Sequence, residues 1–393
     1  MILTKKQEEG LSLAVKKYRD GEKYMIISGY AGTGKSTLVK FIVEALADYG
    51  VNPETDVCFS TFTGKAAQVL LKKGNKNVST LHKLLYESIP KPDGTFFRKR
   101  KLSLEYKIIV VDEISMAPKE MMDLLFTHNV FVIGLGDPFQ LPSINPDDDN
   151  GLLYNPDVFL DEIMRQALDS EIIRLSMAIR HQEPINYENG SEVIVLPKDK
   201  LNTGMLKWAN QILVGTNAVR IGINNQMRAL MGRGNRPESG DKVICLHNYW
   251  EQLATNDDPL VNGTIGFIDN LYETYHKTPR WAGDTTIAVT VANFISDSGA
   301  DFGTLKMDTQ QILTGERCLD RKTIYKLSKN WKTMGLVPME FTYAYAVTCH
   351  KSQGSSWPNV LVLEERFPFD KEEHARWLYT AVTRSEERLV LVR

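Results

Sequence analysis

The segment GYAGTGKST, residues 29–37, limits what this chain can fold into more than any other feature. It matches the phosphate-loop pattern G-x-x-x-x-G-K-[ST], and it lies between an apolar run at 24–28 and a helical apolar stripe at 38–49. Its glycines let backbone N–H groups face phosphate oxygens, and the helix N-terminus adds favourable dipole charge. Lys35 can reach the β- and γ-phosphates, and Ser36 can ligate Mg²⁺. A glycine-rich turn alone would not explain strand, loop and helix in this order.

Two acids follow the apolar run in IIVVDEIS, residues 108–115. Beside a nucleotide, Asp112 would hold Mg²⁺ through water, and Glu113 would orient and deprotonate the attacking water. Acid pairs also occur in solvated turns at strand ends. Because a phosphate loop precedes this pair, the catalytic interpretation is favoured.

A third motif, GLGDPFQLPSI at 134–144, ends another apolar run with Asp137 and Gln140. A glutamine in this place can sense a γ-phosphate and pass that information to a bound polymer. The alternative interpretation is a β-turn built on Asp-Pro.

Four apolar runs in the first 150 residues indicate buried parallel strands. They are Tyr24 to Ser28, Val57 to Thr61, Lys107 to Val111 and Asn129 to Leu135. With helical patterns between them, they predict an α/β sheet with crossover helices.

Two later regions break this α/β pattern. The string PKPDGTFFRKRK, with its Pro-Asp-Gly turn, predicts a β-hairpin within 86–106. Short strand-like pieces among Gly, Asp and Asn predict a β-rich insertion at 236–338, in which 296–335 is the least readable part. Strand signals resume at Phe341 to Thr348, Asn359 to Leu363 and Arg388 to Val392.

The bulk composition predicts a protein of the cytoplasm. The chain has 393 residues, enough for about two to four domains, and a net charge of −2, which still allows a local basic groove. No run approaches the ~20 apolar residues of a membrane helix, and the N-terminal segment lacks the apolar core of a signal peptide. The four cysteines are scattered without a CxxC pair, so neither zinc nor a disulfide framework is indicated.

In this order, the three motifs resemble motifs I, II and III of superfamily 1 DNA helicases. Five further strings resemble other motifs of that family: TFTGKAAQVL (61–70), STLHKLL (79–85), LSMAIRHQ (175–182), VTCHKSQGSSW (347–357) and LYTAVTRSEERLVLV (378–392). The match is closest to the RecD/Dda type of superfamily 1B. A small-molecule kinase or GTPase would not need the second, arginine-bearing unit.

The resemblance implies an α/β protein with two RecA-like phosphate-loop domains and ATP between them. The first would span 1–160, with the hairpin inserted at about 86–106. The second would comprise 161–235 and 339–393, interrupted at 236–338 by an SH3-like β-rich insertion. The implied function is an ATP-dependent DNA helicase that moves 5′ to 3′. The alternative is a DNA-dependent ATPase that remodels nucleic acid or displaces bound protein without processive unwinding.

The resemblance also implies roles for individual residues. Those expected in catalysis are Lys35, Asp112, Glu113, Gln140, Arg180 and Arg384, with Ser36 and Asp112 holding Mg²⁺. Those expected to contact ATP are Gln7, Gly29, Tyr30, Ala31, Gly32, Thr33, Gly34, Lys35, Ser36, Thr37 and Gln353. Those expected to contact DNA are Thr63, Gly64, Lys65, His82, Phe96, Phe97, His350 and Lys351.

Several of these residues have simpler explanations that the sequence leaves open. Gln7 completes a helix capping box with Thr4, and each arginine could be a surface ion-pair partner. Phe96 and Phe97 could form a small hydrophobic contact under the hairpin, and the basic run 98–101 could be a solvated charge cluster.

The resemblance implies ATP and Mg²⁺ as cofactors, and single-stranded DNA and DNA forks as partners. A single-strand-binding protein is a further candidate partner. The protein is expected to act as a monomer, without a membrane, in the cytoplasm of a bacterial cell or a phage-infected host cell.

Overall fold

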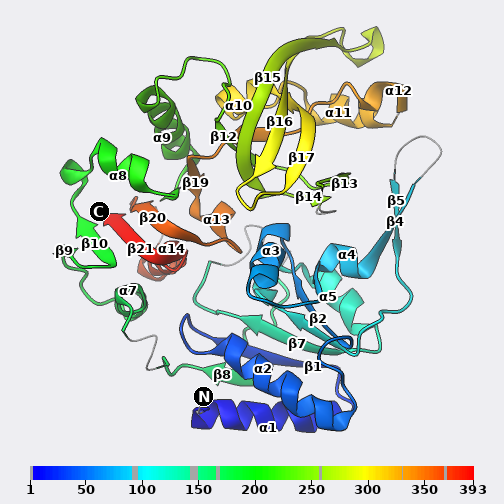
Figure 1. Ribbon diagram of the computed structural model, residues 1–393, viewed down its shortest axis with the longest axis vertical. Coiled ribbons are helices and arrows are strands. Elements are labelled where there is room, and N and C mark those ends of the chain that lie inside the picture. The colour runs from blue at the N-terminus through cyan, green and yellow to red at the C-terminus, as the bar shows by residue number, and fades with distance from the viewer. Residues whose placement is uncertain are drawn as a thin grey trace. The chain divides into compact units, whose positions relative to one another are not determined.

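The computed structural model describes residues 3–90, 96–141, 149–164, 169–255, 259–329, 331–366 and 370–393, except for the side chains of 72, 88–90, 96–98, 250 and 331. The chain divides into two compact units. Unit 1 comprises Met1–Glu87, Lys99–Leu201 and Ser352–Arg393, and unit 2 comprises Ser88–Arg98 and Asn202–Lys351. Within the described residues, no helix has the length and apolarity to cross a membrane. Figure 1 shows the elements of both units.

Unit 1 contains a six-stranded sheet in the order β3-β2-β6-β7-β1-β8. All of its neighbouring strands pair in parallel. The strands are β1 (Tyr24–Gly29), β2 (Val57–Thr61), β3 (Val78–Thr80), β6 (Ile108–Val111), β7 (Phe131–Gly136) and β8 (Val158–Leu160). The four apolar runs predicted as parallel strands are β1, β2, β6 and β7, which confirms the predicted parallel α/β core.

Alternating strand residues bury opposite faces of this sheet. Met25 and Ile27 pack with Ala14 and Leu38 in one hydrophobic cluster, whereas Ile26 packs in a second cluster on the other face. Helices α1 and α2 supply the first cluster, and α4 and α5 supply the second. The helices are α1 (Lys5–Arg19), α2 (Lys35–Leu46), α3 (Gly64–Lys72), α4 (Leu81–Leu85) and α5 (Lys119–Phe126).

The remaining strands of unit 1 form a second group. In this group β21 pairs in parallel with both β10 and β20, and β9 pairs antiparallel with β10. The elements are α7 (Glu171–Arg180), β9 (Glu188–Asn189), β10 (Val193–Leu196), β20 (Trp357–Leu363), α14 (Lys371–Val382) and β21 (Ser385–Val392). Trp377 and Tyr379 are among the largest fully buried side chains, so α14 is a core helix.

Where the sequence predicts a hairpin, β4 (Tyr86–Pro90) and β5 (Phe96–Arg100) pair in a two-stranded sheet. The turn at 91–95 and the side chains of Phe96 and Phe97 lie outside the described part of the chain.

Unit 2 is dominated by a five-stranded sheet in the order β17-β16-β15-β12-β18. All of its pairs are antiparallel, and Figure 1 shows β15 and β16 as its long central strands. Its strands are β12 (Lys242–Cys245), β15 (Ile265–Lys277), β16 (Thr286–Ser296), β17 (Asp301–Asp308) and β18 (Phe341–Tyr343). Elsewhere in unit 2, β13 (Tyr249–Leu253) pairs with β14 (Pro259–Leu260), and β11 (Gln211–Val214) pairs in parallel with β19 (Ala346–Thr348).

Helices complete unit 2. They are α8 (Thr203–Trp208), α9 (Asn217–Leu230), α10 (Thr309–Thr314), α11 (Arg321–Ser328), α12 (Trp331–Met334) and α13 (Cys349–Ser352), the last of which ends in unit 1. The segment 296–335, which the sequence left unread, contains β17 and three of these helices. The expected single strand from Phe341 to Thr348 is wrong, because β18 pairs with β12 whereas β19 pairs with β11.

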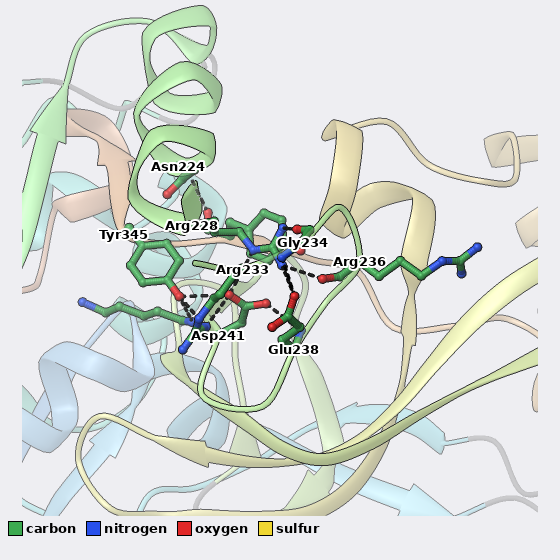
Figure 2. A network of polar contacts seen from close by, with 10 residues as sticks. Asn224, Arg228, Arg233, Gly234, Arg236, Glu238, Asp241 and Tyr345 are labelled. Atoms are coloured by element: carbon green, nitrogen blue, oxygen red, sulfur yellow. Dashed lines mark hydrogen bonds and ion pairs between the residues drawn. The ribbon is translucent and has the colours of Figure 1, made fainter. Parts of the chain in front are cut away.

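A buried carboxylate organises the connection between α9 and β12 (Figure 2). Asp241 is fully buried, and it accepts hydrogen bonds from Arg228 Nε (3.1 Å), the Tyr345 hydroxyl (2.9 Å) and the Glu238 backbone N–H (2.8 Å). Arg233 donates to the same carboxylate. Two guanidinium groups therefore share one buried counter-charge.

Arg228 also holds the connecting loop itself. Its Nη1 donates to the carbonyl of Gly234 (2.7 Å), and its Nη2 donates to the carbonyl of Arg236 (2.5 Å). One turn earlier on α9, Asn224 donates to the carbonyls of Tyr343 and Ala346. The network thus ties α9 to the loop at 231–241 and to the link between β18 and β19.

Candidate active site

The phosphate loop leaves β1 and enters α2 through positions that require glycine. Gly32 and Gly34 have φ of +77° and +80°, in the left-handed region that favours glycine. A Cβ at Gly29 would lie 2.8 Å from the Leu160 carbonyl oxygen, and one at Gly34 would lie 2.6 Å from Gln7 Nε2. Lys35 Nζ donates to the carbonyls of Gly29 (2.6 Å) and Tyr30 (2.9 Å), so the ammonium lies within the loop.

Asp112 and Glu113 follow β6 at the sheet edge where β1 enters the phosphate loop, because parallel strands end at the same edge. Glu113 has a φ of +52°, an uncommon conformation for a residue with a side chain. Its Oε2 is buried without a hydrogen-bond partner. Burial raises the pKa of Glu113, and nearby Asp112 raises it further, whereas Arg384 lowers it.

Arg384, just beyond the C-terminus of α14, points its guanidinium at this glutamate. Its Nη1 lies 3.5 Å from Glu113 Oε1. The side chain is buried, and it donates from Nε to the Thr380 carbonyl (3.1 Å) and from Nη1 to the Ser355 carbonyl (3.3 Å). Arg384 is therefore held beside the acid pair by its own helix and by the segment before β20.

Arg180, at the end of α7, reaches the phosphate loop from another direction. Its Cζ lies 3.6 Å from the ring centroid of Tyr30. One guanidinium nitrogen, Nη1, is buried without a hydrogen-bond partner. Both candidate arginine fingers thus lie against the predicted nucleotide-binding elements of unit 1.

The segment after β7 is held by a local turn and by a residue distant in sequence. Gln140 donates its backbone N–H to the Asp137 carbonyl (3.3 Å), as in a turn. Gln353, expected to contact the nucleotide, donates instead from Nε2 to the Leu141 carbonyl (2.6 Å). A contact between Gln353 and ATP stays a prediction.

Gly354 and Tyr379 belong to the site but were missed in the sequence. A Cβ at Gly354, which has a φ of +71°, would lie 2.8 Å from Thr63 Oγ1 and 3.1 Å from Glu113 Oε2. The Tyr379 hydroxyl bonds both the phosphate loop and Asp137. Both residues stand in motif-like strings, Gly354 in VTCHKSQGSSW and Tyr379 in LYTAVTRSEERLVLV, but no contact was predicted for either of them from the sequence.

Gln7 forms the capping box expected for α1. Thr4 Oγ1 accepts from Gln7 N (3.3 Å), and Gln7 Oε1 accepts from Thr4 N (2.9 Å). The same amide donates from Nε2 to the Thr33 carbonyl (3.2 Å), so Gln7 lies against the phosphate loop. Its contact with adenine stays a prediction.

The expected DNA-contacting residues of unit 1 lie on α3 and α4. Thr63 caps α3 by accepting from Ala66 N (3.2 Å), and Lys65 Nζ lies 4.5 Å from the ring centroid of Trp357. The His82 ring lies 5.5 Å from that of Phe62, measured between centroids. Together they present a helix N-terminus, an ammonium and aromatic rings.

In unit 2, His350 and Lys351 belong to α13. Lys351 Nζ donates to Asn262 Oδ1 (3.1 Å) and lines a pocket of about 260 Å³ with Arg220 at the start of α9. Burial lowers the pKa of His350, so its imidazole is neutral near pH 7.

The parallel sheet, the phosphate loop and the acid pair define a phosphate-loop nucleoside-triphosphatase fold. Residues 3–194 match the family model "AAA domain", and residues 343–392 match "UvrD-like helicase C-terminal domain". The chain is 27% identical to the ATP-dependent DNA helicase Dda of Enterobacteria phage T4 over 68% of this chain and 54% of that protein. It is 25% identical to the ATP-dependent RecD2 DNA helicase of Deinococcus radiodurans over 98% of this chain and 49% of that protein.

A solved structure of Pif1 helicases at forked double-stranded DNA has the same fold. Its TM-score is 0.55 at 18% identity, and the match covers 100% of this chain and 92% of that one. By sequence, the chain is similar to the DNA helicases Dda and RecD2, which confirms the resemblance of its motifs to helicases of the RecD/Dda type. The chain spans about half the length of the two curated relatives.

Proposed function

We propose that this chain is an ATP-hydrolysing motor that translocates 5′ to 3′ on single-stranded DNA and unwinds duplex DNA. The observation that carries the proposal is the position of Arg384, held 3.5 Å from Glu113 in the unit that contains the phosphate loop. A small nucleotide-binding enzyme needs no second arginine-bearing segment at this place. The similarity to Dda and RecD2, both named ATP-dependent DNA helicases, supports DNA as the polymer.

The residues at the site fit ATP with Mg²⁺. Gly29 and Gly34 of the phosphate loop pack so closely that a Cβ would collide with the protein itself, and Glu113 Oε2 is a buried acceptor without a partner. Ser36 and Asp112 would hold the metal, which neutralises charge on the β- and γ-phosphate oxygens when bound. Lys35 would bind the same phosphates, and Gln7 would bond the adenine edge.

Hydrolysis would then depend on three side chains of this chain. Glu113 would accept a proton from the attacking water, while Arg384 and Arg180 would stabilise the negative charge that develops on the transferred phosphoryl group. Gln140 would report the γ-phosphate to the DNA-binding segments. We propose two RecA-like domains, 1–160 and 161–235 with 339–393, and an SH3-like insertion at 236–338.

The DNA track would use backbone and base-face contacts rather than base edges. Thr63, Gly64 and Lys65 would bind phosphates at the N-terminus of α3, and His350 and Lys351 would do so from α13. His82 would stack on a base, and Phe96 and Phe97 would act at the duplex junction. Binding of this kind is sequence-tolerant and weakens with salt.

The direction of movement is tested with two partial duplexes that differ only in the polarity of their single-stranded tail. With ATP and Mg²⁺, we expect the 5′-tailed duplex to be unwound and the 3′-tailed duplex to remain paired. Single-stranded DNA should strongly raise ATP hydrolysis. The readouts are release of a labelled strand and production of phosphate.

A non-hydrolysable ATP analogue serves as the control, since it should support no strand release. Unwinding from the 3′ tail alone would refute the proposed polarity. DNA-stimulated hydrolysis without unwinding of either duplex would instead establish a DNA-dependent ATPase that remodels its substrate. Hydrolysis that is unaffected by DNA would contradict both functions.

The raised pKa of Glu113 predicts an unusual pH dependence. A general base must be ionised. Because its pKa is raised, Glu113 becomes protonated at a higher pH than an ordinary glutamate, whose pKa is about 4.3. We expect the DNA-stimulated kcat/KM for ATP, which reports the pKa values of the free enzyme, to fall on acidification through a limb that lies above this value. The limb is measured by following ATP hydrolysis at a series of pH values, and circular dichroism at each pH checks that the protein stays folded.

Glu113→Gln is the control, because the amide cannot ionise. Its slow residual hydrolysis should lack this acid limb. An acid limb that persists unchanged in Glu113→Gln would assign the titration to another group.

A further inference from the structure

One face of α14 is hydrogen-bonded to the segment that follows β7. Arg376 Nη1 donates to the Pro138 carbonyl (2.8 Å), and Thr380 Oγ1 accepts from Leu141 N (2.9 Å). Between them, the Tyr379 hydroxyl donates to Asp137 Oδ2 (2.6 Å). Positions 376, 379 and 380 share one helix face, so a single helix surface holds the segment that carries Gln140.

Tyr379 reaches beyond this segment to the phosphate loop. Its hydroxyl oxygen also accepts from the backbone N–H of Ala31 (2.8 Å). The side chain is 1% exposed, and the Phe139 ring packs edge-on against it at 5.2 Å between centroids. Burial and the charge of Asp137 raise the pKa of Tyr379, so the hydroxyl keeps its proton and can donate while it accepts.

The two partners of this hydroxyl lie in the two segments that would sense the nucleotide. Ala31 is within the phosphate loop, three residues before Gly34 and four before Lys35. The other oxygen of Asp137 accepts from Phe139 N (3.0 Å), so this carboxylate shapes the turn that presents Gln140. The helix that carries Tyr379 leads directly to Arg384, whose Nε bonds the Thr380 carbonyl.

We propose that Tyr379 is a positioning residue for ATP hydrolysis: its hydroxyl sets the phosphate loop and the Gln140 turn relative to the helix end that carries Arg384. This inference rests on the proposed ATP-hydrolysing function. Tyr379 acts through Asp137 and Ala31. Without the hydroxyl, a buried carboxylate oxygen and a loop N–H lose their shared partner, and this contact no longer fixes the position of one segment relative to the other.

The test is Tyr379→Phe, which removes one oxygen and keeps the ring. We expect the DNA-stimulated kcat to fall by about 10- to 100-fold, the loss typical of small displacements of catalytic groups. The KM for ATP should stay within about twofold, because the groups that hold the phosphates remain. Tyr154→Phe is the matched control: Tyr154 also donates to a carboxylate, Asp149 Oδ2 (2.5 Å), but its side chain is exposed. That variant should match the unmodified protein.

A double-mutant cycle with Asp137→Asn separates positioning from stability. If the two groups act as one unit, the double variant should lose little more kcat than either single variant. An unchanged kcat in Tyr379→Phe, or a loss fully explained by a smaller folded fraction, would overturn the inference while leaving the proposed function in place. If the unmodified protein hydrolyses no ATP with DNA, the proposed function fails and the inference fails with it.

Discussion

Replacing Arg384 by alanine should lower the DNA-stimulated kcat for ATP by about 10³- to 10⁵-fold, the range measured for arginine fingers. Affinity for ATP should change far less, because the finger acts mainly in the transition state. The structure holds the guanidinium 3.5 Å from Glu113 by bonds to Thr380 and Ser355. Its place is therefore set before any reaction begins.

The same substitution should also change the pH dependence. Arg384 lowers the pKa of Glu113, whereas burial and Asp112 raise it. Without the guanidinium the pKa of Glu113 rises further, so a larger fraction of the base is protonated at a given pH. The defect of Arg384→Ala should therefore shrink as the pH is raised, and the acid limb of kcat/KM should move to higher pH.

Two variants serve as controls for this prediction. Arg384→Lys keeps a charge but not the forked donors, so it should recover only part of the rate. Arg388→Ala removes an exposed arginine from β21, the strand that follows Arg384, and should behave like the unmodified protein. A defect of Arg384→Ala confined to ATP affinity, measured by equilibrium binding, would contradict the finger role.

Removing the carboxylate of Asp241 should destabilise unit 2 by about 3–5 kcal/mol, the usual cost of breaking a buried ion pair from one side. Asp241→Ala leaves Arg228, which is 5% exposed, with only the more distant Glu238 (4.0 Å) as counter-charge, and it also removes the carboxylate partner of Arg233. The Tyr345 hydroxyl and the Glu238 N–H lose their acceptor as well. The loop at 231–241 should then open before the rest of the unit.

Hydrogen exchange measures this prediction segment by segment. Protection of the backbone amides of β12 and β18 against exchange should fall in Asp241→Ala. Exchange measured at increasing urea concentrations gives the change in the free energy of unfolding. Asp241→Asn should show an intermediate loss, since the amide still accepts hydrogen bonds. Glu251→Ala, at an exposed acid on β13, should have little effect. Equal stabilities of Asp241→Ala and Glu251→Ala would show that the network contributes nothing.

Much of the site could be predicted from sequence because its signals are short and contiguous. Each of three motifs spans fewer than about a dozen residues: the phosphate loop, the acid pair after β6 and the segment that carries Gln140. Each follows a strand whose run of apolar residues predicts that the strand is buried. Four predicted runs became β1, β2, β6 and β7 with small changes at their ends. The contacts of Arg180 and Arg384 with these elements agree with their motif-like positions.

Other features depend on pairs of residues that are far apart in the chain. Tyr379 meets Asp137 across 242 residues, and Gly354 lies against Glu113. The chain breaks between β18 and β19 because the two strands pair with different partners, and a run of apolar residues does not predict which strand will be its partner. Local sequence determined where phosphate chemistry could occur. Only the tertiary structure decided which distant hydroxyl and glycine lie against it, because most buried polar groups pair with whatever partner the fold brings near them.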